Sequence, residues 1–301
     1  MKKRRKWEFL WLITAVFLVT GCGQSRSEVL DVKSLPIEEA NQVMSSEISP
    51  QQGTEFPKED MFSEISSERE QPLEPISAET ENSSETASES NGFLIVIDAG
   101  HQGKGNREKE PVGPGATEMK AKVSSGTTGC VSGWAEYELN LAVALKLRDE
   151  LEDRGYQVIM VRESHDVDIS NSERAAIANE AGADAFIRIH ANGSEDATVN
   201  GAMTICQTKD NPYNGSIYQS CRDLSDCVLD ELVAAAGCRK RKVWETDTMS
   251  GINWCQVPVT IVEMGYMTNE EEDALMATEE YQDKLVTGIA NGVDRFLFGE
   301  M

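Results

Sequence analysis

Three short apolar runs in the chain each end in a residue that can bind a metal or transfer a proton. They are residues 94–97 shortly before His101, residues 185–189 before His190, and residues 259–262 before Glu263. Runs of this length with several β-branched residues predict strands buried on both faces, as in a parallel sheet. Because open α/β sheets bind ligands at the carboxyl ends of their strands, the three runs predict one shared site at that edge.

Segments with helical periodicity separate these runs. Leu139, Val143, Leu147 and Leu151 recur every four residues, which predicts a helix over 136–154 that Gly155 ends as a C-cap. Further strands are expected at 156–161 and 201–206, and further helices at 171–181, 217–236 and 279–298. Such alternation predicts an α/β fold, a single domain whose mostly parallel, twisted sheet is covered by helices on both faces.

Two segments of this domain lack a clear period. Residues 102–133 are polar and rich in glycine, which is typical of turns, and a connection of this length is expected to be a functional or disordered loop. Residues 243–257 are expected to be irregular or to form an edge hairpin.

The N-terminus has the pattern of an export signal. Residues 1–6 are mostly basic, residues 9–19 are apolar but short for a membrane span, and Val-Thr-Gly leads directly into Cys22. This resembles a bacterial lipobox, and we expect 1–22 to be a lipoprotein signal peptide whose Cys22 is lipidated. The alternatives are an uncleaved anchor helix and a plain signal peptide in which Cys22 is coincidental. In every case we expect the bulk of the protein to be extracytoplasmic, and as a lipoprotein it is expected to be anchored to the bacterial cell membrane.

Residues 23–91 are expected to be a disordered acidic linker. They contain sixteen acidic and four basic residues, a net charge of −12 out of the −24 of the whole chain. With only isolated hydrophobic residues, such a segment cannot bury enough apolar surface to offset its ordering entropy. The acidic balance also argues against nucleic acid as a partner.

Six cysteines follow Cys22, and an even number in an exported protein permits disulfides. Cys221 and Cys227 lie six residues apart on a predicted helix, which is a poor geometry for a bond between them. No pair has the close spacing of a structural zinc site, so that kind of site is rejected.

Two histidines and a carboxylate are the ligand set of a hydrolytic zinc site that keeps a position open for water. His101 and His190 supply the imidazoles, and Glu136, Glu138 and Glu263 are the candidate carboxylates. One of these should bind the metal while another acts as base towards the attacking water. The spacing alone does not assign these roles.

Five segments of the chain form a recognisable series: Ile97-Asp-Ala-Gly-His101, Glu136-Tyr-Glu-Leu-Asn-Leu141, Glu173-Arg-Ala-Ala-Ile-Ala-Asn179, Arg188-Ile-His-Ala-Asn192 and Val262-Glu-Met-Gly-Tyr-Met-Thr-Asn269. In this order and spacing they resemble the zinc-dependent N-acetylmuramoyl-L-alanine amidase family, the amidase-3 group. The resemblance covers residues 92–301, which are therefore expected to be an amidase catalytic domain. The segment between His101 and Glu136 is longer than the shortest form of the family.

The resemblance implies that His101, Glu136 and His190 hold one Zn2+ per chain and that Glu263 is the catalytic carboxylate. Glu136 is preferred to Glu138 because the ligand of the family lies four residues before the position matched by Asn140. The implied reaction is hydrolysis of the amide between N-acetylmuramic acid and L-alanine in peptidoglycan. Arg174 and Arg188 could bind a carboxylate of the substrate or form structural ion pairs.

Two other functions would use the same residues. A zinc peptidase or deacetylase acting on the same polymer needs a similar site and differs in its products. A catalytically silent wall-binding lipoprotein could use the groove as a receptor, but such a protein would have no need of all four residues, His101, Glu136, His190 and Glu263.

The lipobox interpretation predicts the effect of Cys22→Ala. Without the thiol there is no lipidation, so the variant should leave the membrane fraction while its specific activity stays unchanged. Fractionation of cells followed by an activity assay measures both. A variant that stays in the membrane fraction would favour an uncleaved anchor helix.

Overall fold

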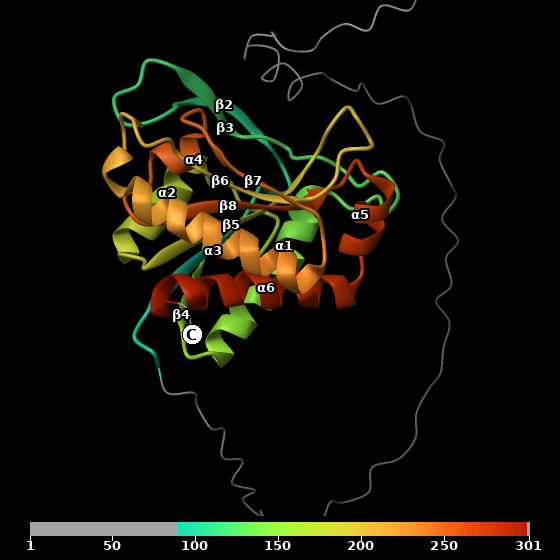
Figure 1. Cartoon of the computed structure of the whole chain (residues 1–301). Coiled ribbons are helices and arrows are strands. Elements are labelled where there is room, and N and C mark those ends of the chain that lie inside the picture. Colours follow the sequence, from blue (N-terminus) through green and yellow to red (C-terminus); the bar gives the residue numbers. More distant parts are fainter. Residues whose placement is uncertain (1–89, 300–301) are drawn as a thin grey trace, which may run out of the picture. The chain divides into compact units, whose positions relative to one another are not determined.

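The computed structural model describes residues 90–299 (Figure 1). The expected signal peptide, Cys22 and nearly all of the expected linker lie outside the described residues. Within residues 90–299, no helix is both long and apolar enough to cross a membrane.

A six-stranded sheet forms the centre of the described domain, with the strand order β4-β1-β5-β8-β6-β7. Its strands are β1 (Leu94–Ala99), β4 (Gln157–Met160), β5 (Ala185–Asn192), β6 (Ala202–Cys206), β7 (Lys240–Glu245) and β8 (Val259–Tyr266). All neighbouring strands are parallel except β6 and β8, which pair antiparallel. The fold is therefore α/β with a mostly parallel sheet, as the sequence predicts.

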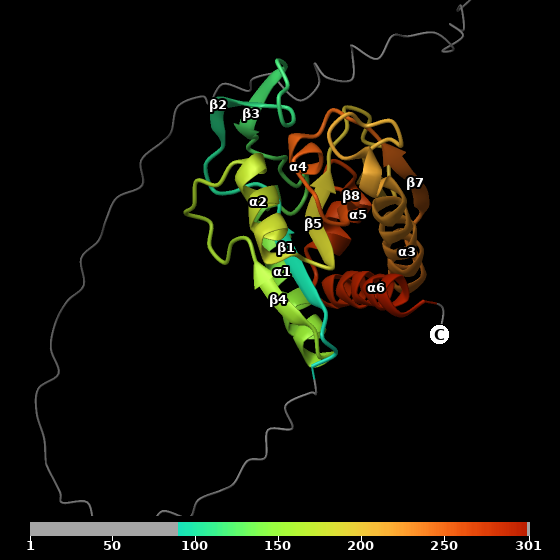
Figure 2. The same ribbon diagram turned by 90° about the vertical axis from the view of Figure 1, so that its left-hand side faces the viewer.

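Helices cover both faces of this sheet (Figures 1 and 2). The larger core packs Ile95 and Ile97 against α1 (Glu136–Asp153), α3 (Tyr218–Ala236) and α6 (Glu279–Phe298). The smaller core packs Val96 and Phe186 against α2 (Asn171–Ala181) and α4 (Ser250–Asn253). Successive residues of β1 thus enter opposite cores, which explains why this strand is apolar throughout.

Several parts of the structure differ from the sequence predictions. Residues 102–133 contain a hairpin of β2 (Asn106–Pro111) and β3 (Met119–Val123). Of the two expectations for 243–257, the edge hairpin is wrong, because β7 is an edge strand parallel to β6; after Glu245 the segment is irregular apart from the short helix α4. The short helix α5 (Glu270–Met276) and a 3-10 turn at Gly215–Ile217 were not predicted. The hairpin depends on distant partners: Trp254 Nε1 donates to the carbonyl oxygen of Pro111, and Asn253 Nδ2 donates to that of Val112.

All six cysteines of the described residues are unpaired. Cys206, Cys221 and Cys255 are buried in the smaller core, while Cys130 is exposed. Burial raises the pKa of Cys206 to about 12, so this thiol stays protonated. The three buried cysteines thus pack as small apolar side chains.

A buried ion-pair cluster connects β1, β5 and α2. Asp98 lies between Arg174 Nη1 at 2.5 Å and Arg188 Nε at 2.9 Å, and all three side chains are at most 3% exposed. Burial alone would raise the pKa of Asp98, but the two guanidinium groups outweigh it and hold this pKa well below its usual range. Of the two interpretations of these arginines, the structure shows the ion pair.

We expect Asp98→Ala to lower the free energy of unfolding by about 3–5 kcal/mol, because it leaves buried guanidinium groups without their counter-charge. Urea unfolding of the full-length protein in detergent measures the change. Asp210→Ala, which removes an exposed carboxylate, is the matched control and should change stability by less than about 0.5 kcal/mol. Equal stability of the two variants would contradict this account of the cluster.

Candidate metal centre

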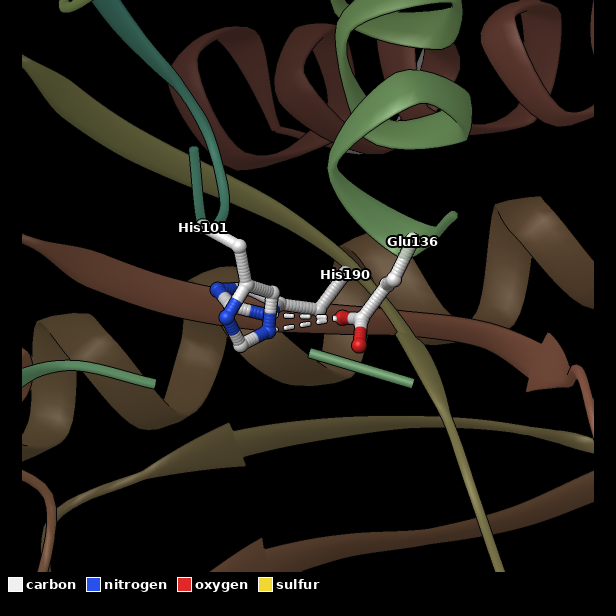
Figure 3. Close-up of side chains that lie close together, drawn as sticks. All are labelled: His101, Glu136 and His190. Carbon is white, nitrogen blue, oxygen red and sulfur yellow. Dashed lines mark hydrogen bonds and ion pairs between the residues drawn. The ribbon is translucent and has the colours of Figure 1, made fainter. Parts of the chain in front are cut away.

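Three side chains from separate elements converge at the carboxyl edge of the sheet (Figure 3). His101 follows β1, His190 belongs to β5, and Glu136 is the first residue of α1. Glu136 Oε1 lies 3.0 Å from His101 Nε2 and 3.2 Å from His190 Nδ1. One potential ligand atom from each residue lies within 4.8 Å of the other two.

The backbone around His101 is shaped to bring these groups together. His101 has φ 60°, and it is the one residue other than glycine with a positive φ between residues 90 and 299. Such strain persists where the surrounding structure enforces it, often at functional sites. Glycine is required next to it, because a Cβ on Gly100 would lie 2.3 Å from the ring of His190. A Cβ on Gly126 would lie 2.9 Å from Glu136 Oε2.

Two buried arginines donate hydrogen bonds to backbone carbonyl oxygens of this turn. Arg174 Nη2 donates to the carbonyl oxygen of His101, and Arg162 Nη2 donates both to that of Gly100 and to that of Tyr137, the residue after Glu136. Burial, with a smaller effect of Arg174, lowers the pKa of Arg162 to about 10, so it stays charged at neutral pH. Arg162 thus links the turn carrying one imidazole to the helix end carrying the carboxylate.

Hydrogen bonds orient the imidazoles. His101 Nδ1 lies 2.9 Å from the carbonyl oxygen of Ser124, which can only accept, so Nδ1 donates and Nε2 faces Glu136. A hydrogen bond of this kind, from the ring nitrogen that does not bind the metal, fixes the tautomer of a metal-binding histidine. His190 turns Nδ1 towards Glu136, while its buried Nε2 has no hydrogen-bond partner.

The carboxylate of Glu136 dominates the electrostatics of this cluster. Burial would raise its pKa, but His101 and His190 outweigh this and hold the pKa well below its usual range. Burial lowers the pKa of His101, yet Glu136 more than compensates and raises it. Burial lowers the pKa of His190 to about 4, so this imidazole is neutral. Two imidazoles around one buried anion form a site that favours a cation.

Glu263 lies next to the three clustered residues on β8, where it is the register partner of His190. Its Oε2 is buried and has no hydrogen-bond partner within the described residues. Burial and the negative charge of Glu136 raise the pKa of Glu263 to about 8. The carboxyl group is therefore available to exchange a proton near neutral pH.

The other candidates lie outside this cluster. Glu138 Oε2 accepts from the backbone N–H of Ala135 and so caps the start of α1, while His165 packs edge-on against the ring of Tyr137. Ser124 and Arg162 were missed by the sequence analysis. Neither belongs to a recognisable motif, and their roles depend on contacts with residues far away in the sequence.

Comparison with known proteins identifies the family of this chain. The family described as N-acetylmuramoyl-L-alanine amidase matches residues 95–295. The uncharacterized protein YqiI of Bacillus subtilis is 31% identical over 68% of this chain and 85% of its own length. The N-acetylmuramoyl-L-alanine amidase LytC of the same organism is 28% identical over 67% of this chain, which spans only 35% of LytC.

A solved structure shares the fold over the same region. The crystal structure of the N-acetylmuramyl-L-alanine amidase Ami1 from Mycobacterium smegmatis is 27% identical, with a TM-score of 0.63. The match covers 71% of this chain and all of that one. On the family match over residues 95–295, this chain belongs to the N-acetylmuramoyl-L-alanine amidase family, which confirms the resemblance drawn from its motifs.

Proposed function

We propose that this protein is a zinc-dependent hydrolase that cleaves the amide between N-acetylmuramic acid and L-alanine in peptidoglycan. The observation that carries the proposal is the cluster of His101, Glu136 and His190, with ligand atoms within 4.8 Å of one another, beside the buried carboxyl group of Glu263. Membership of the amidase family and the names of the relatives support the choice of reaction.

The donor set suits one Zn2+ per chain. Two imidazoles and one carboxylate are the protein ligands of hydrolytic zinc sites that keep a position open for water. His101, Glu136 and His190 would hold the ion. The backbone N–H of Thr127 donates to Glu136 Oε2 at 2.9 Å and the carbonyl oxygen of Ser124 accepts from His101, so two ligands have the outer partners that orient them.

Glu263 is the proposed general base and acid. When bound, zinc supplies Lewis acidity that polarises the scissile carbonyl and lowers the pKa of water. Glu263 accepts a proton from the attacking water and passes it to the nitrogen of the leaving L-alanine. Because its pKa is raised to about 8 before any cation binds, and a nearby cation lowers it, this carboxyl group can move a proton in both directions near pH 7.

The proposed location is extracytoplasmic, since the polymer lies outside the cell membrane. The lipobox ending at Cys22 would anchor the chain there, and residues 23–91 would give the domain reach into the wall. The family match begins at residue 95, so it does not bear on the anchor.

The proposed imidazole ligands can be tested by substitution. His101→Ala and His190→Ala should each abolish the stoichiometric zinc of the purified full-length protein, because two remaining ligands hold the ion too weakly. Elemental analysis by mass spectrometry measures zinc per chain. The third histidine of the chain supplies the matched control: His165→Ala should keep one zinc. Retention of one zinc in both ligand variants would exclude the site.

A separate prediction distinguishes the two glutamates at the start of α1. Glu136→Ala should lose zinc affinity, while Glu138→Ala should keep it and lower the stability of the domain by about 0.5–2 kcal/mol through loss of the helix cap. Titration with a competing chelator measures the affinity, and thermal unfolding measures the stability. The reverse result for zinc would mean that Glu138 is the ligand.

The role of Glu263 is tested by Glu263→Gln, which keeps the shape of the side chain and removes the proton acceptor. General acid–base groups contribute about 10²–10⁴-fold, so hydrolysis of purified peptidoglycan should fall by at least about 100-fold. Zinc content and binding to the polymer should barely change. If the variant lost its zinc, Glu263 would be a ligand; if it stayed fully active, another group would transfer the proton.

A further inference from the structure

The edge strand β7 begins with a basic run in a chain whose net charge is −24. Arg239 to Lys242, which we call the basic rim, are all exposed. β7 is parallel to β6, and β6 is antiparallel to β8, so β7 begins at the edge where β8 ends. Figure 2 shows β7 at the opposite side of the sheet from β4. The basic rim therefore lies at the same edge as the metal centre.

A continuous strip of side chains connects Glu263 with this rim. Met203 on β6 is the register partner of Glu263, and the hydroxyl group of Tyr266 lies 4.0 Å from Met203 Sδ. The guanidinium carbon of Arg241 lies 5.4 Å from the centre of the Tyr266 ring.

Arg241 is held in place and still has donors to offer. Within residues 90–299 the guanidinium group of Arg241 contacts the ring of Tyr266, and its Nη1 donates to the carbonyl oxygen of Asn200 at 3.1 Å. Neither of these two partners carries a charge. The aliphatic part of the Arg241 side chain passes over Gly201, where a Cβ would lie 3.0 Å from Arg241 Cγ. An exposed guanidinium fixed in this way is suited to a carboxylate, which it can bind through two parallel hydrogen bonds.

The neighbouring Lys240 is different. Lys240 pairs with Asp230 on α3, whereas Arg241 contacts the ring of Tyr266 on β8. The strip therefore includes Arg241 and excludes Lys240, although both belong to the basic rim.

The proposed mechanism sets the direction of the substrate. Glu263 delivers its proton to the nitrogen of the leaving peptide, so this nitrogen lies on the side of the metal centre that Glu263 occupies. The strand order β1-β5-β8-β6-β7 puts His101 and His190 on one side of Glu263 and Arg241 on the other. A peptide stem that leaves the metal centre on this side would extend from Glu263 towards β7.

We propose that Arg241 binds a free carboxylate of the stem peptide at its second residue, a subsite that selects acidic stems. This inference rests on the proposed function. β7 and β8 are separated by two strand spacings, which is about 10 Å. The Arg241 side chain shortens this distance, because it extends from β7 to the ring of Tyr266, a residue of β8. Two extended residues span about 7 Å, so the second residue of the stem comes within reach of the guanidinium.

The test uses two synthetic substrates that differ in one group. Both are N-acetylmuramoyl tripeptides with an amidated C-terminus, in which the second residue is a glutamate joined to the third through its γ-carboxyl group. The α-carboxyl group of this glutamate is free in one substrate and a carboxamide in the other. For the full-length wild-type protein, KM should be about five- to tenfold lower for the carboxylate substrate. Arg241→Gln should remove this difference by raising KM for that substrate, with kcat and the KM of the amide unchanged.

Lys240→Ala is the matched control and should preserve the preference. Calorimetric binding of both substrates to the slow Glu263→Gln protein separates this proposal from the proposed function. Discrimination in binding without release of amine by the wild type would refute the function and leave the subsite standing. Hydrolysis of both substrates with equal KM, or an equal effect of Arg241→Gln on both, would overturn the subsite.

Discussion

The buried negative charge of Glu136 is the constraint on which the site depends. This carboxylate is 4% exposed and lies between two imidazoles; it raises the pKa of His101, while burial lowers the pKa of His190 to about 4. A buried anion needs a compensating cation, and a divalent metal held by the same three side chains meets this need better than one proton. The same charge raises the pKa of Glu263, so the proposed ligand and the proposed base are electrostatically coupled.

The fold provides the rigidity that such a cluster requires. β1 and β5 end at the same sheet edge, and the buried Asp98 with its two arginines joins these strands to α2 immediately below the histidines. Arg162 and Arg174 hold the turn through its carbonyl oxygens, which keeps His101 in a conformation that it would otherwise avoid. The buried ion pairs that stabilise the fold and the side chains proposed to bind the metal are therefore different residues that lie in adjacent parts of one network.

Sequence patterns predicted the elements that local signals determine. α2 and α6 have the predicted bounds, and Ser170 and Thr278 cap their first turns. β2 and β7 lack an apolar alternation, and β3 shows one over only five residues, Met119 to Val123. The hairpin also depends on a distant partner, because Trp254 donates to the carbonyl oxygen of Pro111, so the sequence analysis did not find these strands. Residue spacing also left Glu136 and Glu138 as alternatives, because both lie in the first turn of one helix. The geometry separates them: one faces the histidines and the other caps the helix.

The identity of the bond cleaved tests the central claim most directly. Purified peptidoglycan digested by the full-length protein should yield glycan strands free of peptide and stem peptides with a new amino-terminal L-alanine, both measurable by mass spectrometry with end-group labelling. Addition of a chelator should stop their release, and zinc should restore it. Cleavage between amino acids of the stem, or release of acetate with the stems still attached, would contradict the account and indicate a peptidase or a deacetylase.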